Sequence, residues 1–246
     1  MSTISEKQKL EKREKIIRSA VDTISKKGFK GSSMREIARK ASAGYAAIYN
    51  YFPTVEAIVY AYYEKQLDLS YQRSRAIQGF NEFTLQEQLQ AFFETQLEVF
   101  LPDREFVEVT FWPITISSTG NDRYSKPIQS TFSSIIAELF EAAIAVEKIP
   151  DQVFLEQIYS FFWHYNKGLV LYWLNDGSNQ FRNTTVLLDK SLDLAISFIK
   201  AGIADKVLDV ATFLLKNHVL KYQGLIEDPM EIIHKVKRQF MGDNHA

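Results

Sequence analysis

SMREIARKASAGYAAIYNYF, residues 33–52, reads as two short helices joined by a tight turn. Ile37, Ala38 and Ala41 recur at helical spacing and give the first helix one apolar face. The small residues that follow interrupt this pattern, and Gly44 is the one we expect to adopt the unusual backbone angles of a turn. The stretch therefore predicts a helical pair with a sharp change of direction.

The second helix of the pair has one side that is unusual for a protein surface. Ile48 and Phe52, four residues apart, are expected to point inward. The other side carries small and hydrogen-bonding residues instead of Lys and Glu: Tyr45, Ala46, Tyr49 and Asn50. Alanines allow a close backbone approach, and the polar tips can bond to bases or phosphates, as a helix in the major groove of DNA requires. An ordinary hairpin within a helical bundle is the alternative that these residues leave open.

From Glu14 to about Lys65 the chain resembles the DNA-binding domain of the TetR family of transcriptional regulators. The match covers about fifty positions at fixed spacing: Gly28-Phe29, Ser32-Ser33-Met34, Ile37-Ala38, Ala41, Ile48-Tyr49-Asn50-Tyr51-Phe52-Pro53 and Glu56. Two departures stand out. The family usually has Gly-Val-Ser where this chain has residues 42–44, and often has a lysine where this chain has Val55.

The resemblance and the residue types together give each position a predicted role on DNA. Arg35 corresponds to the residue that the family uses to reach a base or a phosphate. The others divide by the part of the duplex they should meet: Tyr45, Ala46 and Ala47 on base edges, Ser33, Tyr49 and Tyr51 on phosphates, and Asn50 on either. The expected partner is therefore double-stranded DNA with a palindromic operator.

Composition excludes several other classes of protein. The chain has 246 residues, 46% of them hydrophobic, and no cysteine. Disulfides, zinc–thiolate sites and thiol catalysis are therefore excluded. No apolar run reaches the length of a membrane span and the N-terminus is polar, so we expect a cytoplasmic protein. Apolar spacings of three and four recur throughout, which predicts an all-α fold.

Charge is distributed unevenly along the chain. Residues 1–65 hold 13 Lys and Arg against 7 Asp and Glu, whereas the remaining residues hold 16 against 23. A basic N-terminal part on an acidic remainder suits a polyanion such as the phosphate backbone. We expect residues 1–53 to form the helix-turn-helix domain (the head) and residues 54–246 to form a helical domain for ligand binding and dimerisation (the body). A helix from Thr54 to about Ile77 should belong to both.

Two later helices, expected at 152–175 and 181–200, are apolar on more than one face. A helix that is apolar on two sides is buried on two sides, and a second subunit can supply one of them. TetR-like proteins dimerise through two helices in this part of the chain, so the resemblance also implies a homodimer. A lysine at Leu188 or Leu192 should disrupt the dimer if either residue faces the partner.

Aromatic residues are abundant in the body, with 18 Phe, 12 Tyr and 3 Trp in the whole chain. Each one alone is most simply explained as core filling. As a group, in a domain that should hold an effector, they predict an apolar cavity for an uncharged or weakly polar ligand of aromatic or acyl character. The candidate lining residues are Phe92, Phe93, Gln96, Phe111, Trp112, Phe132, Phe161 and His164.

No catalytic constellation is evident in the sequence. Glu231 and His234 have the spacing of one half of a di-metal helix site, but the second pair that such a site needs is missing. We therefore expect no metal, no cofactor and no enzymatic activity. The sequence predicts a homodimeric, ligand-responsive transcriptional regulator, and it favours a repressor over an activator. The alternative is a helical-bundle enzyme or a small-molecule-binding protein that does not bind DNA.

Overall fold

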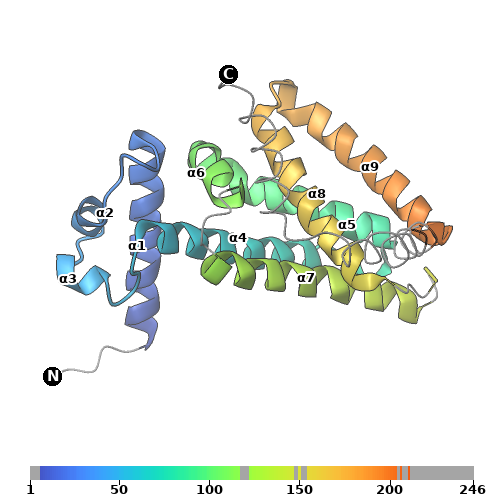
Figure 1. The fold of residues 1–246 in the computed structure, drawn as a ribbon, viewed down its shortest axis with the longest axis horizontal. Helices are drawn as coiled ribbons and strands as arrows, with labels where there is room; N and C mark the ends of the chain where they lie inside the picture. The colour runs from blue at the N-terminus through green and yellow to red at the C-terminus, as the bar shows by residue number, and fades with distance from the viewer. Residues whose placement is uncertain are drawn as a thin grey trace, which may run out of the picture. The chain divides into compact units, whose positions relative to one another are not determined.

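The computed structural model describes residues 6–116, 122–146, 149–150 and 154–203, together with 206 and 210. Within these residues the chain forms α-helices linked by short 3₁₀ helices and has no strand (Figure 1). The elements are α1 (Glu6–Lys27), α2 (Met34–Lys40), α3 (Tyr45–Ile48), α4 (Val55–Arg75), η1 (Phe80–Glu82), α5 (Leu85–Phe100), η2 (Leu101–Asp103), α6 (Arg104–Ile116), α7 (Asp122–Ala145), α8 (Leu155–Asn175), η3 (Asn179–Phe181) and α9 (Arg182–Lys200). The predicted all-α fold is confirmed.

The described residues fall into two units. Those up to residue 150 and from 155 to 197 make the first, and residue 154 and those from 198 onward belong to the second. Glu231 and His234 lie outside the described residues. None of the described helices is both long enough and apolar enough to cross a membrane.

The head is built on a small core shared by α1, α2 and α3. Gly28 follows the last residue of α1, and its φ of +76° is the left-handed conformation that commonly ends a helix at a glycine. Ser33 caps α2, with its hydroxyl accepting a hydrogen bond from the Glu36 amide. Ile37 and Ile48 are fully buried, so the inward faces of both helices lie where the sequence predicts them.

The turn between α2 and α3 differs from the prediction. Ser42, not Gly44, adopts the left-handed conformation, with φ of +54°, while Gly44 has φ of −61°. The Ser42 amide bonds to the Arg39 carbonyl at 3.2 Å, and the Ala43 amide bonds to the Ala38 carbonyl at 2.9 Å. These two bonds are the C-terminal cap that usually places glycine at the left-handed position, so the chain makes the expected turn with an unfavourable residue.

The α4 helix connects the head to the body without a break. Thr54 caps it by accepting a hydrogen bond from the Ala57 amide at 3.1 Å, as the sequence predicts. Along its length α4 packs against α1 in the head and against α5 and α7 in the body. Buried positions therefore occur on several of its sides, among them Ile58, Tyr62 and Leu67. One rigid element thus belongs to both parts.

Pro113 lies inside α6, which continues to Ile116. Asp103 lies in η2, and both of its carboxylate oxygens accept hydrogen bonds from the guanidinium of Arg18. The Glu87 side chain and Thr84 form a full capping box at the start of α5, which fixes where that helix begins.

Leu188 and Leu192 do not face a partner. Both are fully buried inside the protomer. The exposed apolar residues of α8 and α9 are others: Phe161, Tyr172, Val186, Leu187, Leu194 and Phe198. The sequence shows that these helices are apolar on two sides, but it does not show which side meets the protomer's own core.

Candidate functional site

The predicted DNA-contacting residues lie in α2 and α3 or directly beside these helices. Ser33, Arg35, Tyr45, Ala46, Ala47, Tyr49 and Asn50 are exposed, and Tyr51 is half-buried. The hydroxyl of Ser33 already serves as the helix cap described above. Since the α3 sequence has no charged residue, its outward side consists of methyl groups, aromatic rings and hydroxyls.

Three of these exposed side chains, Arg35, Tyr45 and Tyr49, contact one another. The guanidinium carbon of Arg35 lies 5.4 Å from the centre of the Tyr45 ring. The rings of Tyr45 and Tyr49 meet edge to face at 5.5 Å, and their hydroxyl oxygens are 3.1 Å apart. That hydrogen bond raises the pKa of Tyr49 above its ordinary value. The three side chains therefore have fixed positions although they are exposed.

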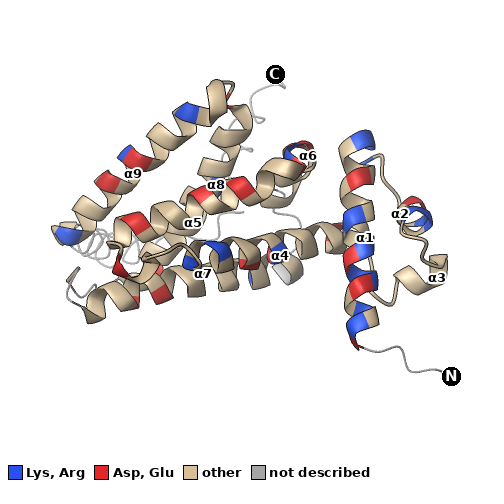
Figure 2. Cartoon of the chain, turned by 180° about the vertical axis from the view of Figure 1, so that it is seen from behind, with Lys and Arg blue, Asp and Glu red and all other residues tan. Residues whose placement is uncertain are grey.

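Half of the Lys and Arg side chains of the head form ion pairs among the described residues. Figure 2 shows Lys and Arg interleaved with Asp and Glu along α1. The pairs that bind helices of the head together include Lys27–Glu36 and Lys40–Asp22, the latter at 3.1 Å. Much of the positive charge of the head thus stabilises its own packing, and the exposed surface of α2 and α3 has fewer uncommitted cations than the composition suggests.

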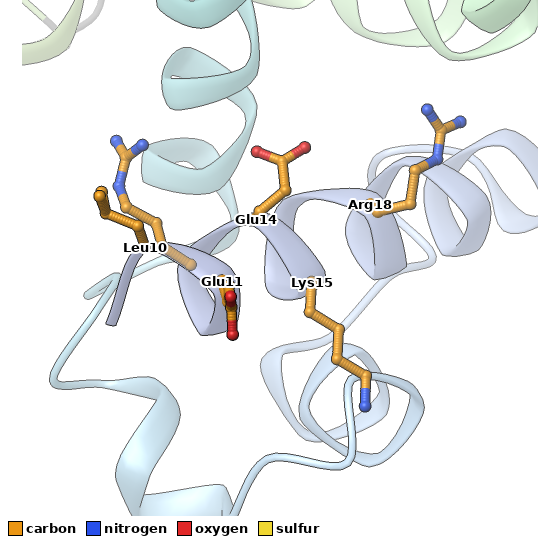
Figure 3. A pocket seen from close by; sticks show the side chains of 6 residues that line it. Leu10, Glu11, Glu14, Lys15 and Arg18 are labelled. Atoms are coloured by element: carbon orange, nitrogen blue, oxygen red, sulfur yellow. The ribbon is translucent and has the colours of Figure 1, made fainter. Parts of the chain in front are cut away.

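A broad surface hollow of about 710 Å³ lies beside the first half of α1 (Figure 3). Its lining alternates in charge: Leu10, Glu11, Arg13, Glu14, Lys15 and Arg18. Glu14 pairs with Lys65, and Arg13 lies 4.0 Å from Glu64, both on α4. The hollow therefore lies along the contact between α1 and α4, and protein partners already pair with Arg13, Glu14 and Arg18 of its lining.

A single bidentate ion pair joins α1 to the connection between α5 and α6. Arg18 donates to both oxygens of Asp103, one of them at 3.0 Å, and the Asp103 side chain is almost fully buried. The nearby hydroxyl of Tyr62 is buried, and burial together with the Asp103 charge raises its pKa far above the ordinary value. Removing Arg18 would leave a buried carboxylate without its counterion, so this pair holds head and body together.

The interior of the body is an aromatic cluster. Phe92, Phe93 and Phe132 are fully buried, with ring centres 5.4 to 6.4 Å apart. Phe162 stacks on Phe93 at 6.4 Å, and Trp163 meets Phe132 at 5.4 Å. The helices α5, α7 and α8 thus bring three of the predicted lining residues together.

The other predicted lining residues lie elsewhere. Phe111 is buried beside Tyr63 of α4, at 5.9 Å between ring centres. Trp112 and Phe161 are 56% and 52% exposed, and His164 is exposed with its Nδ1 atom 2.8 Å from the Ser160 carbonyl oxygen. Of these three exposed side chains, Phe161 contacts the edge of the aromatic cluster, with its ring centre 5.4 Å from that of Phe162.

Two buried amide oxygens inside the body have no hydrogen-bond donor among the described residues. Gln96 on α5 and Asn166 on α8 are each 4% exposed, and the Oε1 and Oδ1 atoms are unpartnered. A buried carbonyl left without a donor costs about 1–3 kcal/mol. Gln96 was predicted as a polar lining residue, whereas Asn166 was missed. Its position one turn after Phe162, as a polar residue on an apolar face, is the signal that could have identified it.

A separate groove of about 450 Å³ opens at the surface where the end of α8 and the start of α9 meet α5. Its apolar part includes three leucines and two aromatic residues, and two glutamates contribute carboxylates. These residues are Leu97, Leu101, Leu188, Trp173, Phe181, Glu94 and Glu98. This groove does not include the buried aromatic cluster, and its two acidic groups differ from the uncharged lining that the sequence predicts.

Comparison with known proteins identifies the family. The model "Bacterial regulatory proteins, tetR family" matches residues 16–62, and the model "Tetracyclin repressor-like, C-terminal domain" matches residues 88–214. No curated protein has a significant match.

Several solved structures have a similar fold. The transcriptional regulator FadR from Bacillus subtilis, in complex with stearoyl-CoA, is 19% identical, with a TM-score of 0.60 over 77% of this chain and 98% of that one. FadR from Thermus thermophilus, a TetR-family repressor in complex with lauroyl-CoA, is 19% identical, with a TM-score of 0.59 over 75% and 93%. A TetR regulator from Nitrosomonas europaea is 20% identical, with a TM-score of 0.56 over 75% and 97%.

The similarity covers both parts of the chain. One family model spans the head and the start of α4, and the other covers more than half of the sequence. The exposed α2–α3 surface is the part that such regulators place on DNA. The chain belongs to the TetR family of bacterial regulatory proteins and is a transcriptional regulator, not an enzyme.

Proposed function

We propose that this regulator is a homodimeric repressor that binds a palindromic operator and leaves it when a small, largely apolar effector binds. Residues 1–53 form the DNA-binding domain, and residues 54–246 form the effector-binding and dimerisation domain. The observation that carries the proposal is α4, which packs against α1 in the head and against α5 and α7 in the body. A change in the body is therefore transmitted to the head through one helix.

The surface of α3 supports binding in the major groove. Ala46 and Ala47 are exposed and add only a methyl group each, so the helix backbone can approach base edges closely. Tyr49, Asn50 and the half-buried Tyr51 supply polar groups for phosphates or bases. Two such heads in a dimer read two half-sites, which is why the operator should be palindromic.

The exposed apolar residues of α8 and α9 support dimerisation. Phe161 and Tyr172 on α8, and Leu187 and Leu194 on α9, are 37% to 58% exposed. The two helices are held together by a hydrogen bond of 2.7 Å between Tyr165 and Ser191. A second copy that packs its own α8 and α9 on this surface would remove it from water, and apolar burial is the main driving force of such association.

The interior of the body supports an apolar effector with a hydrogen-bonding group. The aromatic cluster suits an acyl chain, and the unpartnered Gln96 and Asn166 oxygens suit a donor group on the ligand. Two proteins of similar fold were crystallised with stearoyl-CoA and lauroyl-CoA. We therefore propose a long-chain acyl compound as the effector of this regulator.

Release from DNA follows from the geometry of a dimer. Two recognition helices bound to half-sites one helical turn apart, roughly 35 Å, tolerate little change in their separation. An effector that tilts α4 changes that separation. A 100-fold loss of DNA affinity requires about 2.7 kcal/mol of coupling between the two sites, and the same factor must apply to the effector.

DNA selection tests the proposal most simply. The full-length protein is incubated with random duplex DNA, and bound sequences are recovered and sequenced. We expect a palindromic site whose affinity falls steeply as salt rises, because phosphate contacts release counterions. Recovery of no preferred sequence, or affinity that does not change with salt, contradicts DNA binding as the function.

A further inference from the structure

Arg35 is the exceptional arginine of the head. Residues 6–65 contain four arginines. Arg13, Arg18 and Arg39 each lie within 4.0 Å of a carboxylate, on Glu64, Asp103 and Glu36 respectively. Among the described residues no carboxylate pairs with Arg35, which is exposed on α2. Its charge is therefore available for a partner outside the chain.

The contacts of Arg35 fix its position without neutralising it. The guanidinium lies over the ring of Tyr45, with 5.4 Å between the guanidinium carbon and the ring centre. An aromatic face attracts a cation but leaves the N–H donors at the edge of the guanidinium free. Tyr45 is in turn held by Tyr49, through the edge-to-face ring contact and the hydroxyl pair 3.1 Å apart.

Tyr45 and Tyr49 contact each other although both side chains are exposed. Tyr45 and Tyr49 are 51% and 44% exposed, so their contact adds little to the core. Exposed side chains ordinarily keep their rotamer freedom, and ordering them costs conformational entropy before any ligand arrives. Three ordered side chains on a recognition surface lower the entropy cost of binding, because they are already in place.

We propose that Tyr45 is a positioning residue that presents Arg35 to a guanine in the major groove, and that Tyr49 fixes Tyr45. This inference rests on the proposed function, since it names the base that the α2–α3 surface reads. Guanine offers two acceptors, O6 and N7, in the geometry that a guanidinium edge matches with two hydrogen bonds. The adjacent uncharged α3 surface, with its exposed Ala46, does not obstruct that approach.

A phosphate contact by Arg35 is the competing arrangement. A phosphate accepts the same fork of donors, so the ring contact alone does not separate the two. The consequences differ. A base contact makes affinity depend on one base pair of each half-site, whereas a phosphate contact weakens binding to all sequences equally and reduces the salt slope by about one.

The test uses the full-length protein and the palindrome that it selects. Wild type and Arg35→Ala are compared on that site and on sites in which each guanine in turn becomes 7-deazaguanine, which lacks the N7 acceptor. We expect one guanine per half-site at which 7-deazaguanine measurably lowers the DNA affinity of wild type and leaves the affinity of Arg35→Ala unchanged. The full preference for that guanine should be about 5- to 150-fold per half-site.

Tyr45 is then tested through its effect on that preference. Tyr45→Leu should reduce the guanine preference of wild type by about 2- to 5-fold, the range expected for an exposed cation–π contact. It should not change the preference in the Arg35→Ala background. Tyr45→Phe keeps the ring and should keep the preference largely intact, and Tyr49→Phe should weaken it less than Tyr45→Leu does.

Arg39→Ala is the matched control, because Arg39 is an exposed arginine on the same helix that pairs with Glu36 at 3.9 Å. It should leave the preferred base at every position unchanged. The inference is wrong if Tyr45→Leu and Arg35→Ala affect the guanine preference independently, or if Arg35→Ala lowers the affinity for all sequences equally. Either result leaves DNA binding itself in place. If wild type itself selects no sequence, the proposed function fails as well, so the two failures are distinguishable.

Discussion

Ser42 occupies a backbone position that favours glycine. Its φ of +54° brings the Cβ atom close to the carbonyl oxygen, at a cost of roughly 1–2 kcal/mol for an ordinary residue. The side chain is exposed. Ser42→Gly should therefore raise the free energy of unfolding by about 1 kcal/mol and the melting temperature by about 2–4 °C, as measured by calorimetry.

The control for this prediction keeps the strain and removes only the hydroxyl. Ser42→Ala should not stabilise the protein, because alanine has the same Cβ atom as serine. If Ser42→Ala raised the melting temperature as much as Ser42→Gly, backbone strain would not be the cause.

Gln96 should affect stability and effector binding in opposite directions. Its Oε1 atom is buried without a donor, so Gln96→Leu removes an unsatisfied polar group and should leave the unliganded protein at least as stable as wild type. The same change should weaken binding of stearoyl-CoA, measured by calorimetry, by about 0.5–1.5 kcal/mol if one hydrogen bond is lost.

Gln88 on the same helix is the matched control. It is buried like Gln96, but its Nε2 atom donates to the Phe80 carbonyl at 2.9 Å. Gln88→Leu should destabilise the protein and leave effector affinity unchanged. Equal effects of the two substitutions on effector binding would exclude Gln96 as part of the effector site.

At the scale of the helices, Asp176 fixes the start of α9. Its carboxylate accepts hydrogen bonds from the amides of Ser178 and Thr184, at 2.9 and 2.8 Å, and from the Thr184 hydroxyl at 2.7 Å. Burial alone would raise the pKa of Asp176, but these bonds to Ser178 and Thr184 outweigh it and hold the pKa well below its usual value. The bonds therefore favour the charged form.

A lowered pKa in the folded state makes a stability contribution that depends on pH. The contribution of Asp176 should be fully present above its unfolded pKa, near 3.8, and should be lost as pH falls through the lower folded value. Urea unfolding should show Asp176→Asn less stable than wild type at pH 7, with a smaller difference below pH 4. Asp193→Asn, an exposed change on the same helix, should alter stability little. A difference that grows with acidity would contradict this role of Asp176.

The dimerisation surface gives a second prediction for α9. Leu194 is 58% exposed, whereas Leu192 is fully buried in the protomer. Leu194→Lys should give a folded monomer by light scattering and circular dichroism, because a lysine there meets water in the monomer and an apolar surface in the dimer. Leu192→Lys should instead unfold or aggregate the chain. A dimer that survives Leu194→Lys would place the interface elsewhere.

Sequence patterns were reliable wherever the structural signal was local. The start of the helix at Thr54 and the inward position of Ile48 depend on neighbouring residues, and both were predicted correctly. The choice between Ser42 and Gly44 failed because both residues suit a turn and only the final hydrogen bonds decide between them.

Signals that depend on distant residues were not visible in the sequence. Arg18 and Asp103 are 85 positions apart, so their pairing required the fold. The inward side of α9 could not be assigned either, because leucines occur on both sides of it. For the same reason the predicted effector residues divided between the buried cluster and the exposed Trp112, Phe161 and His164.

At the scale of the whole molecule, the account requires that the effector and the operator exclude one another through α4. The direct measurement is a calorimetric titration of lauroyl-CoA and stearoyl-CoA into the free dimer and into the dimer bound to its selected palindrome. We expect at least one of them to bind the free dimer more tightly, by the same factor by which it weakens DNA binding, because the coupling is reciprocal. Equal affinity for free and DNA-bound protein, or no binding of either compound, would contradict the account.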